Sequence, residues 1–117
     1  MTVPGLRQVR LQDQIRADVA EMIALELKDP RIGFVTVTRV ELAADLRTAY
    51  VWVSVLGKKE DQDGTIAGLS SATGYLRHEL GHRLRMRRVP ELTFMLDHST
   101  EDVLRIESLL GEAPKDR

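Results

Sequence analysis

The sequence predicts a small α+β domain in which helices pack on one face of a three-stranded mixed sheet. Three observations predict this class. Apolar residues recur at three- and four-residue spacing in two long segments, β-branched residues crowd two short neighbouring segments, and a third short segment alternates apolar with polar residues. The predicted order is αββαβα. At 117 residues, one domain over 1–117 is expected, with an ordered core over about 6–110.

The first predicted element is a helix over residues 6–28. Its apolar side chains lie three or four positions apart and therefore share one face. They are Leu11, Ile15, Val19, Met22, Ile23 and Leu27. Asp29-Pro30 ends the helix, because proline disfavours helical geometry in the residue before it.

Two strands are predicted next, over residues 34–42 and 47–56. The first is rich in β-branched residues, and the second alternates Val51, Val53 and Val55 with a more polar side. The short connection between them predicts an antiparallel hairpin. The polar residues 57–64 predict a loop.

A second helix is predicted over residues 65–85. Its apolar stripe consists of Ile66, Leu69, Thr73, Leu76, Leu80 and Leu84. Gly74 lies inside this helix, where glycine costs about 1 kcal/mol relative to alanine. A kink, the close approach of a partner, or close packing within the fold would each explain this glycine.

A third strand is predicted over residues 89–96, where Leu92, Phe94 and Leu96 alternate with other residues. The helix between the second and third strands predicts a crossover, which makes these two strands parallel. A short last helix is expected to begin at Ser99 or Thr100.

Composition excludes several classes of site. There is no cysteine, which excludes disulfides, thiolate zinc sites and a cysteine nucleophile. The first residues lack the apolar run of a signal peptide, and no apolar run reaches membrane-spanning length. These features predict a soluble cytoplasmic protein. The few aromatic residues disfavour RNA modules that stack bases on aromatic platforms.

Positive charge concentrates in one segment, although the net charge is only −1. Residues 77–88 contain five arginines and two histidines but only one acid, Glu79. The arginines are Arg77, Arg83, Arg85, Arg87 and Arg88. This cluster predicts an RNA-binding edge that relies mainly on phosphate contacts.

The same segment contains His78-Glu79-Leu80-Gly81-His82, an HExxH string typical of zinc proteases. A third ligand could come from Glu101 or Asp102. On a helical wheel, however, both histidines point away from the apolar stripe, where a small domain has no dry cavity for a catalytic zinc. The sequence therefore favours RNA binding over a zinc protease and predicts no metal, no cofactor and no catalytic residue.

The order of short motifs along the chain resembles the ribosome-binding factor A family of bacterial small-subunit assembly factors. The matching segments cover about a hundred residues. They are Lys28-Asp29-Pro30-Arg31-Ile32-Gly33, Val35-Thr36-Val37, Val40-Glu41, Asp45-Leu46 with Ala49 and Val51, Ala72-Thr73-Gly74-Tyr75-Leu76-Arg77, Arg85-Met86-Arg87, Val89-Pro90-Glu91-Leu92-Thr93-Phe94, Asp97-His98-Ser99, Arg105-Ile106 and Leu109-Leu110.

The resemblance implies a type II KH-like fold with its second helix kinked at Ala72-Thr73-Gly74, an Ala-x-Gly element that replaces the GxxG loop of ordinary KH domains. It implies a non-catalytic, monomeric factor without a small-molecule substrate. Such a factor binds free small (30S) ribosomal subunits through 16S ribosomal RNA. It assists late maturation and processing of that RNA, including during cold adaptation.

The charge cluster and the Ala72-Thr73-Gly74 element give most of the expected RNA contacts, and Arg7, Arg10, Lys28 and Arg31 are expected to support them. The full set is Arg7, Arg10, Lys28, Arg31, Ala72, Thr73, Gly74, Arg77, Arg83, Arg85, Arg87 and Arg88. A generic protein-interaction module is the alternative from another class. It would bind with little dependence on salt, whereas phosphate contacts make RNA binding strongly salt-dependent.

Overall fold

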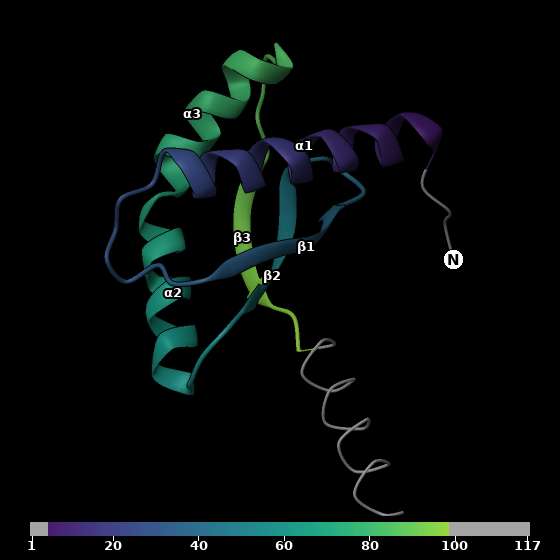
Figure 1. Ribbon diagram of the computed structural model, residues 1–117. Coiled ribbons are helices and arrows are strands. Elements are labelled where there is room, and N and C mark those ends of the chain that lie inside the picture. The colour runs from purple at the N-terminus through teal and green to yellow at the C-terminus, as the bar shows by residue number, and fades with distance from the viewer. Residues whose placement is uncertain (1–4, 99–117) are drawn as a thin grey trace, which may run out of the picture.

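The computed structural model describes residues 5–98. Its elements are α1 (Leu6–Leu25), β1 (Val35–Leu42), β2 (Thr48–Val55), α2 (Lys59–Ser71), α3 (Thr73–Leu84) and β3 (Glu91–Leu96) (Figure 1). The sheet order is β1-β2-β3, with β1 antiparallel and β3 parallel to β2. The predicted mixed sheet is confirmed. The helix expected from Ser99 onward lies outside the described residues.

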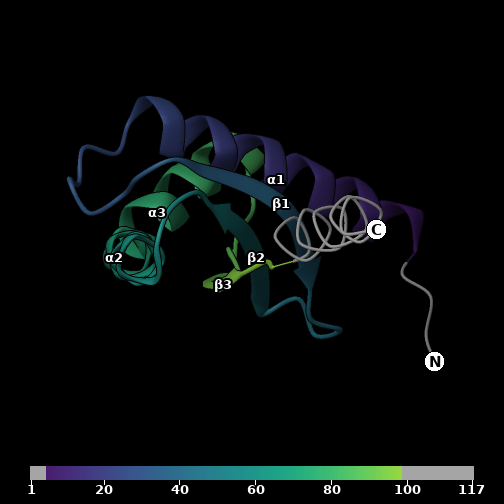
Figure 2. The same cartoon turned by 60° about the horizontal axis from the view of Figure 1, so that its bottom comes forward.

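The helices cover one face of the sheet, as predicted. Figure 2 shows α1 and α3 on the same side of the strands. Alternate residues of β2, such as Val51 and Val53, are fully buried and share one core with Ile15 of α1 and Leu80 of α3. Complete burial of such a side chain contributes about 1.5–3 kcal/mol. The other face of the sheet is more open, with Tyr50 exposed there.

The predicted loop over 57–64 is wrong, because α2 already begins at Lys59. The backbone N–H of Lys58 donates a 2.8 Å hydrogen bond to the Asp61 carboxylate. Glu60 and Asp61 lie in the first turn, where carboxylates interact favourably with the helix dipole. The acids that suggest a loop in the sequence therefore start a helix. The predicted end of the first helix also differs, because α1 ends at Leu25, earlier than the predicted Lys28.

The predicted second helix is divided at Ala72, which confirms the kink. Ala72 has φ −92° and ψ 0°, and its N–H lies 3.2 Å from the Gly68 carbonyl oxygen and 3.0 Å from that of Leu69. Two hydroxyls bind carbonyls nearby, with Ser71 donating to Ala67 at 3.0 Å and Thr73 donating to Ser70 at 3.0 Å. Such local side-chain hydrogen bonds often bend helices.

A β-bulge in β1 re-aims one arginine. The register shifts between Val37 and Arg39, so Arg39 pairs with Trp52 of β2. An extra residue in one strand moves the following side chains to the opposite faces. Arg39 thus reaches the open face, where its guanidinium carbon lies 4.0 Å from the centroid of the Trp52 ring, and Val40 enters the core.

Candidate RNA interface

Gly74 leaves the backbone bare at the start of α3. Apart from its chain neighbours and the adjacent backbone of its own helix, a Cβ atom built there would meet no atom of the described residues within 4 Å. Among residues 5–98, Gly57 is the one glycine with a positive φ, so Gly74 does not need glycine for its backbone geometry either. Close packing within the described part of the fold is therefore excluded as the reason for this glycine. The approach of a partner still explains it.

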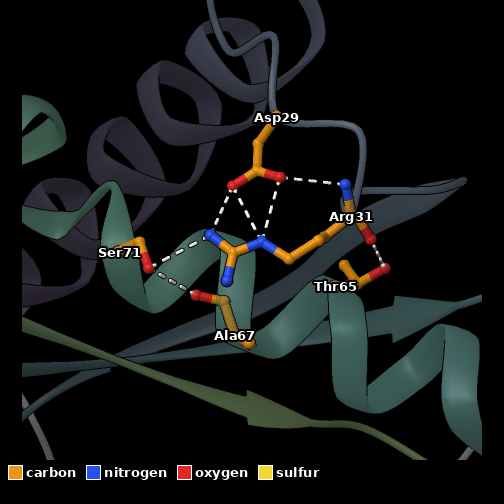
Figure 3. Close-up of polar contacts among 5 residues, drawn as sticks. All are labelled: Asp29, Arg31, Thr65, Ala67 and Ser71. Atoms are coloured by element: carbon orange, nitrogen blue, oxygen red, sulfur yellow. Dashed lines mark hydrogen bonds and ion pairs between the residues drawn. The ribbon is translucent and has the colours of Figure 1, made fainter.

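The loop between α1 and β1 is fixed beside this break (Figure 3). The Arg31 side chain binds the Asp29 carboxylate, with its Nη2 atom 2.6 Å from Asp29 Oδ2, and the same nitrogen donates to Ser71 Oγ at 3.2 Å. These hydrogen bonds from Arg31 lower the pKa of the Asp29 carboxyl group. Arg31 therefore lies beside Ser71, the residue before Ala72, with its charge balanced by Asp29.

A buried threonine of α2 also holds this loop in place. Thr65 is fully buried, and its hydroxyl donates to the Arg31 carbonyl at 3.3 Å and accepts from the Gly33 N–H at 3.1 Å. The loop is thereby anchored along α2, while Lys28 at its start is exposed. The structure thus brings Arg31 beside Ser71, the last residue of α2, although forty positions separate the two residues in sequence.

Arg83 is turned toward α1 rather than outward. Its guanidinium lies 3.0 Å from Glu21, 2.8 Å from Glu26 and 3.8 Å from Asp18. The hydrogen bond to Glu21 raises the pKa of Arg83, and a hydrogen bond to Glu26 raises the pKa of the Tyr75 phenol. This network joins α1 to α3 and uses the charge of Arg83 within the fold.

Arg77 also has internal partners. Its Nε donates to the Pro90 carbonyl and its Nη2 to the Val89 carbonyl, both at 3.0 Å. The side chain therefore ties α3 to the segment that enters β3. Like Arg83, it belongs to the arginine-rich segment in sequence but serves a structural contact in the fold.

Three other arginines of the cluster are exposed at the end of α3 and in the connection from α3 to β3. Arg85 ends the helix in the left-handed conformation, with φ 52°, and Arg87 and Arg88 follow. In the described part of the chain these side chains make no hydrogen bond or ion pair. Arg85 lies about 17 Å along α3 from Gly74, at 1.5 Å per residue, whereas Arg88 lines a groove with Arg77. All three cations are therefore exposed, and Arg85 lies at the opposite end of α3 from Gly74.

Arg7 and Arg10 are not gathered with these groups. Both are exposed in the first turns of α1, whereas the last turn of α1 meets α3 through the Glu26–Tyr75 hydrogen bond. About 28 Å of helix separates the two ends.

An arginine that was not predicted as a contact, Arg47, shares a polar groove of about 470 Å³ with Arg88. Arg47 lies just before β2, outside any periodic pattern in the sequence, so nothing in the sequence marked it as a contact.

The HExxH string forms no three-ligand metal site among residues 5–98. His78 and His82 are exposed on α3, and no group of three or more potential ligands is arranged around them there. The acids considered as third ligands, Glu101 and Asp102, lie outside the described residues.

None of the described helices combines the length and apolar character needed to cross a membrane.

Loss of the Arg77 side chain is expected to destabilise the fold. Arg77→Ala leaves the Val89 and Pro90 carbonyls without their charged donor, which costs about 2 kcal/mol of unfolding free energy. Urea denaturation measures this change. Arg87→Ala removes the same charge from an exposed site and is expected to change stability by less than about 0.5 kcal/mol. Equal losses in both variants would contradict the structural role of Arg77.

Two glycines of the α2–α3 segment are expected to respond in opposite directions to alanine. A Cβ at Gly68 would lie 2.7 Å from Ile32 Cγ1 and 3.3 Å from Asp29 Oδ2, so Gly68→Ala forces the loop away and costs about 1–3 kcal/mol. Gly74→Ala meets open space and raises stability by up to about 1 kcal/mol through helix propensity. Thermal denaturation of the two variants compares them, and a stabilised Gly68→Ala protein would contradict the packing described above.

Comparisons with known proteins agree with this geometry. The sequence pattern of the family "Ribosome-binding factor A" matches residues 7–110. Ribosome-binding factor A of Natranaerobius thermophilus is 47% identical over 108 residues, which are 92% of this chain and 82% of that protein.

Solved structures are similar as well. The crystal structure of ribosome-binding factor A from Thermus thermophilus has a TM-score of 0.71 at 33% identity, over 79% of this chain and 97% of that one. A homology model of the Thermus thermophilus factor, fitted into a cryo-EM map of a 30S complex, has a TM-score of 0.64 at 34% identity. It covers 76% of this chain and 93% of its own. The expected KH-like fold is therefore confirmed, and the chain belongs to the ribosome-binding factor A family.

Proposed function

We propose that this protein is a non-catalytic assembly factor of the cytoplasm that binds free small ribosomal subunits through 16S ribosomal RNA. In this proposal it assists late maturation and processing of that RNA, including in the cold. Membership of the family supports the proposal, as does the 30S complex into which the Thermus thermophilus relative is fitted.

The observation that carries the proposal is the bare backbone at Gly74. Within the described fold neither packing nor a positive φ requires a glycine here, and glycine lowers helix stability relative to alanine, so we infer that the close approach of a partner explains it. Without a Cβ, the first turn of α3 lets a sugar–phosphate chain come closer than any other residue would allow. The N-terminal end of a helix also favours anions.

The cations around α3 supply the remaining attraction. Lys28, which follows α1, and Arg85, Arg87 and Arg88, which follow Leu84, are exposed and have no internal partner in the described chain. They are the residues assigned to phosphate contacts. Arg31 takes part more weakly because Asp29 balances its charge, and Arg77 and Arg83 contribute by holding α3 in place.

The remaining expected contacts have smaller roles in this proposal. Arg7 and Arg10 reach RNA only if the bound RNA extends along α1 toward its first turns. Ala72 and Thr73 act with Gly74 through the shape of the break, because their side chains are partly buried and the Thr73 hydroxyl is held by Ser70.

The proposal is tested by titrating the protein with purified 16S ribosomal RNA at several salt concentrations. Each phosphate contact to RNA releases counterions, so affinity is expected to fall steeply as salt rises, with a logarithmic slope of about −0.7 per contact. An equal mass of unrelated RNA serves as control. Affinity that does not change with salt, or equal affinity for both RNAs, would contradict the proposal.

A further inference from the structure

The RNA interface proposed above leaves one pair of side chains unexplained. His78 and His82 are exposed on successive turns of α3. Their Nε2 atoms are 3.3 Å apart, and their rings stand nearly perpendicular, at 76°, with centroids 4.7 Å apart. The helix thus holds two imidazole nitrogens toward a common point.

The spacing of these nitrogens fits a metal ion. Zinc binds imidazole nitrogen at about 2.0–2.1 Å, and two ligands at tetrahedral positions are then about 3.3–3.4 Å apart. We propose that His78 and His82 form a two-histidine site for a divalent transition-metal ion, of the class of Zn²⁺, Ni²⁺ or Cu²⁺, with water in the remaining coordination positions. The imidazole ligands and the i, i+4 spacing select this class over Mg²⁺ and Ca²⁺, which prefer oxygen.

Little has to change for the ion to bind. The two Nε2 atoms lie at hydrogen-bond distance in the free protein, and one donates to the other when its ring carries the hydrogen on Nε2 and the other ring carries it on Nδ1. Binding requires both Nε2 lone pairs, so that hydrogen moves to Nδ1 of its own ring and the metal replaces the hydrogen bond. The helix already holds the two rings together, so no chain segment has to be ordered.

The surroundings make this a binding site rather than a catalytic one. The residues described in the structure supply no third ligand, and both histidines face solvent. Nearby charges partly offset each other, since Glu79 follows His78 and Arg85 lies three positions after His82. A surface site of this kind binds an ion without the dry cavity that activates a metal-bound water for hydrolysis.

The chain contains a matched control for the test, because it has three histidines and His98 lies outside the pair. Tag-free full-length protein is titrated with ZnCl₂ at pH 7.5 by isothermal calorimetry, and circular dichroism verifies the fold of each variant. We expect one zinc ion per chain. His78→Ala and His82→Ala each lower the affinity at least tenfold, whereas His98→Ala leaves it unchanged.

Any of three results would overturn the site, the last two of which concern the variants. The first is a wild-type protein that binds no zinc at millimolar concentration. The others are a His98→Ala variant that loses as much affinity as His78→Ala, and a His78→Ala variant that loses none. The RNA-binding proposal does not depend on any of these results, since the titration contains no RNA.

Discussion

Replacing Arg85, Arg87 and Arg88 together with alanine is expected to lower the affinity for 16S ribosomal RNA by about 100-fold at about 0.1 M salt. Each lost phosphate contact reduces the logarithmic salt slope by about 0.7, so the slope is expected to flatten by about 2. The fold is expected to survive, because these side chains are exposed and make no hydrogen bond or ion pair with other described residues. Filter binding over a range of salt concentrations measures both quantities.

A charge-matched triple variant separates this surface from general electrostatic attraction. Arg7, Arg10 and Arg16 are all exposed on α1. Their joint replacement with alanine removes the same total charge but leaves Arg85, Arg87 and Arg88 in place. We expect less than a tenfold loss of affinity. An equal loss in the two triple variants would show that net charge, and not the position of the arginines, determines binding.

The Gly74→Val variant is expected to stay folded and to lose RNA affinity by at least tenfold. The described fold has open space at this position, and valine and glycine are both weak helix formers, so stability is expected to change by less than about 1 kcal/mol. The added side chain instead covers the bare backbone at the break, where the RNA is proposed to approach. Thermal denaturation and RNA titration of the same preparation separate the two effects.

A second exposed helix position serves as the control for bulk. Ala17 is exposed on α1 and away from the break. Ala17→Val also introduces a β-branched side chain on a helix surface, and we expect RNA affinity to stay within about twofold of the wild type. Normal RNA affinity in a folded Gly74→Val protein would contradict the role assigned to the break.

Regular periodicity made most of the fold predictable. The three strands begin and end within two residues of their predicted limits. In β2, for example, β-branched residues alternate with other residues, and polar turn residues follow the strand. The start of α2 was missed because Glu60 and Asp61 suit both a polar loop and the first turn of a helix. The bulge at Thr38 leaves no mark on the composition of β1, so the outward position of Arg39 could not be predicted.

The candidate site was predictable only in part, because tertiary contacts decide which cations are available. A helical wheel orients Arg83 but cannot show that Glu21 and Glu26 of α1 lie opposite it. The hydrogen bond between Arg31 and Ser71 likewise joins segments that no local pattern relates. Gly74, by contrast, was conspicuous in the sequence, since a glycine inside a helical pattern costs stability.

Co-sedimentation with purified ribosomal particles tests the central claim most directly. The protein is mixed with free small subunits or with complete ribosomes, at low and at moderate salt, and pelleted. We expect it to pellet with free small subunits, less at moderate salt, and to stay in solution with complete ribosomes. A protein that stays in solution with both particles, or that pellets equally with both, would contradict its assignment as a factor for free small subunits.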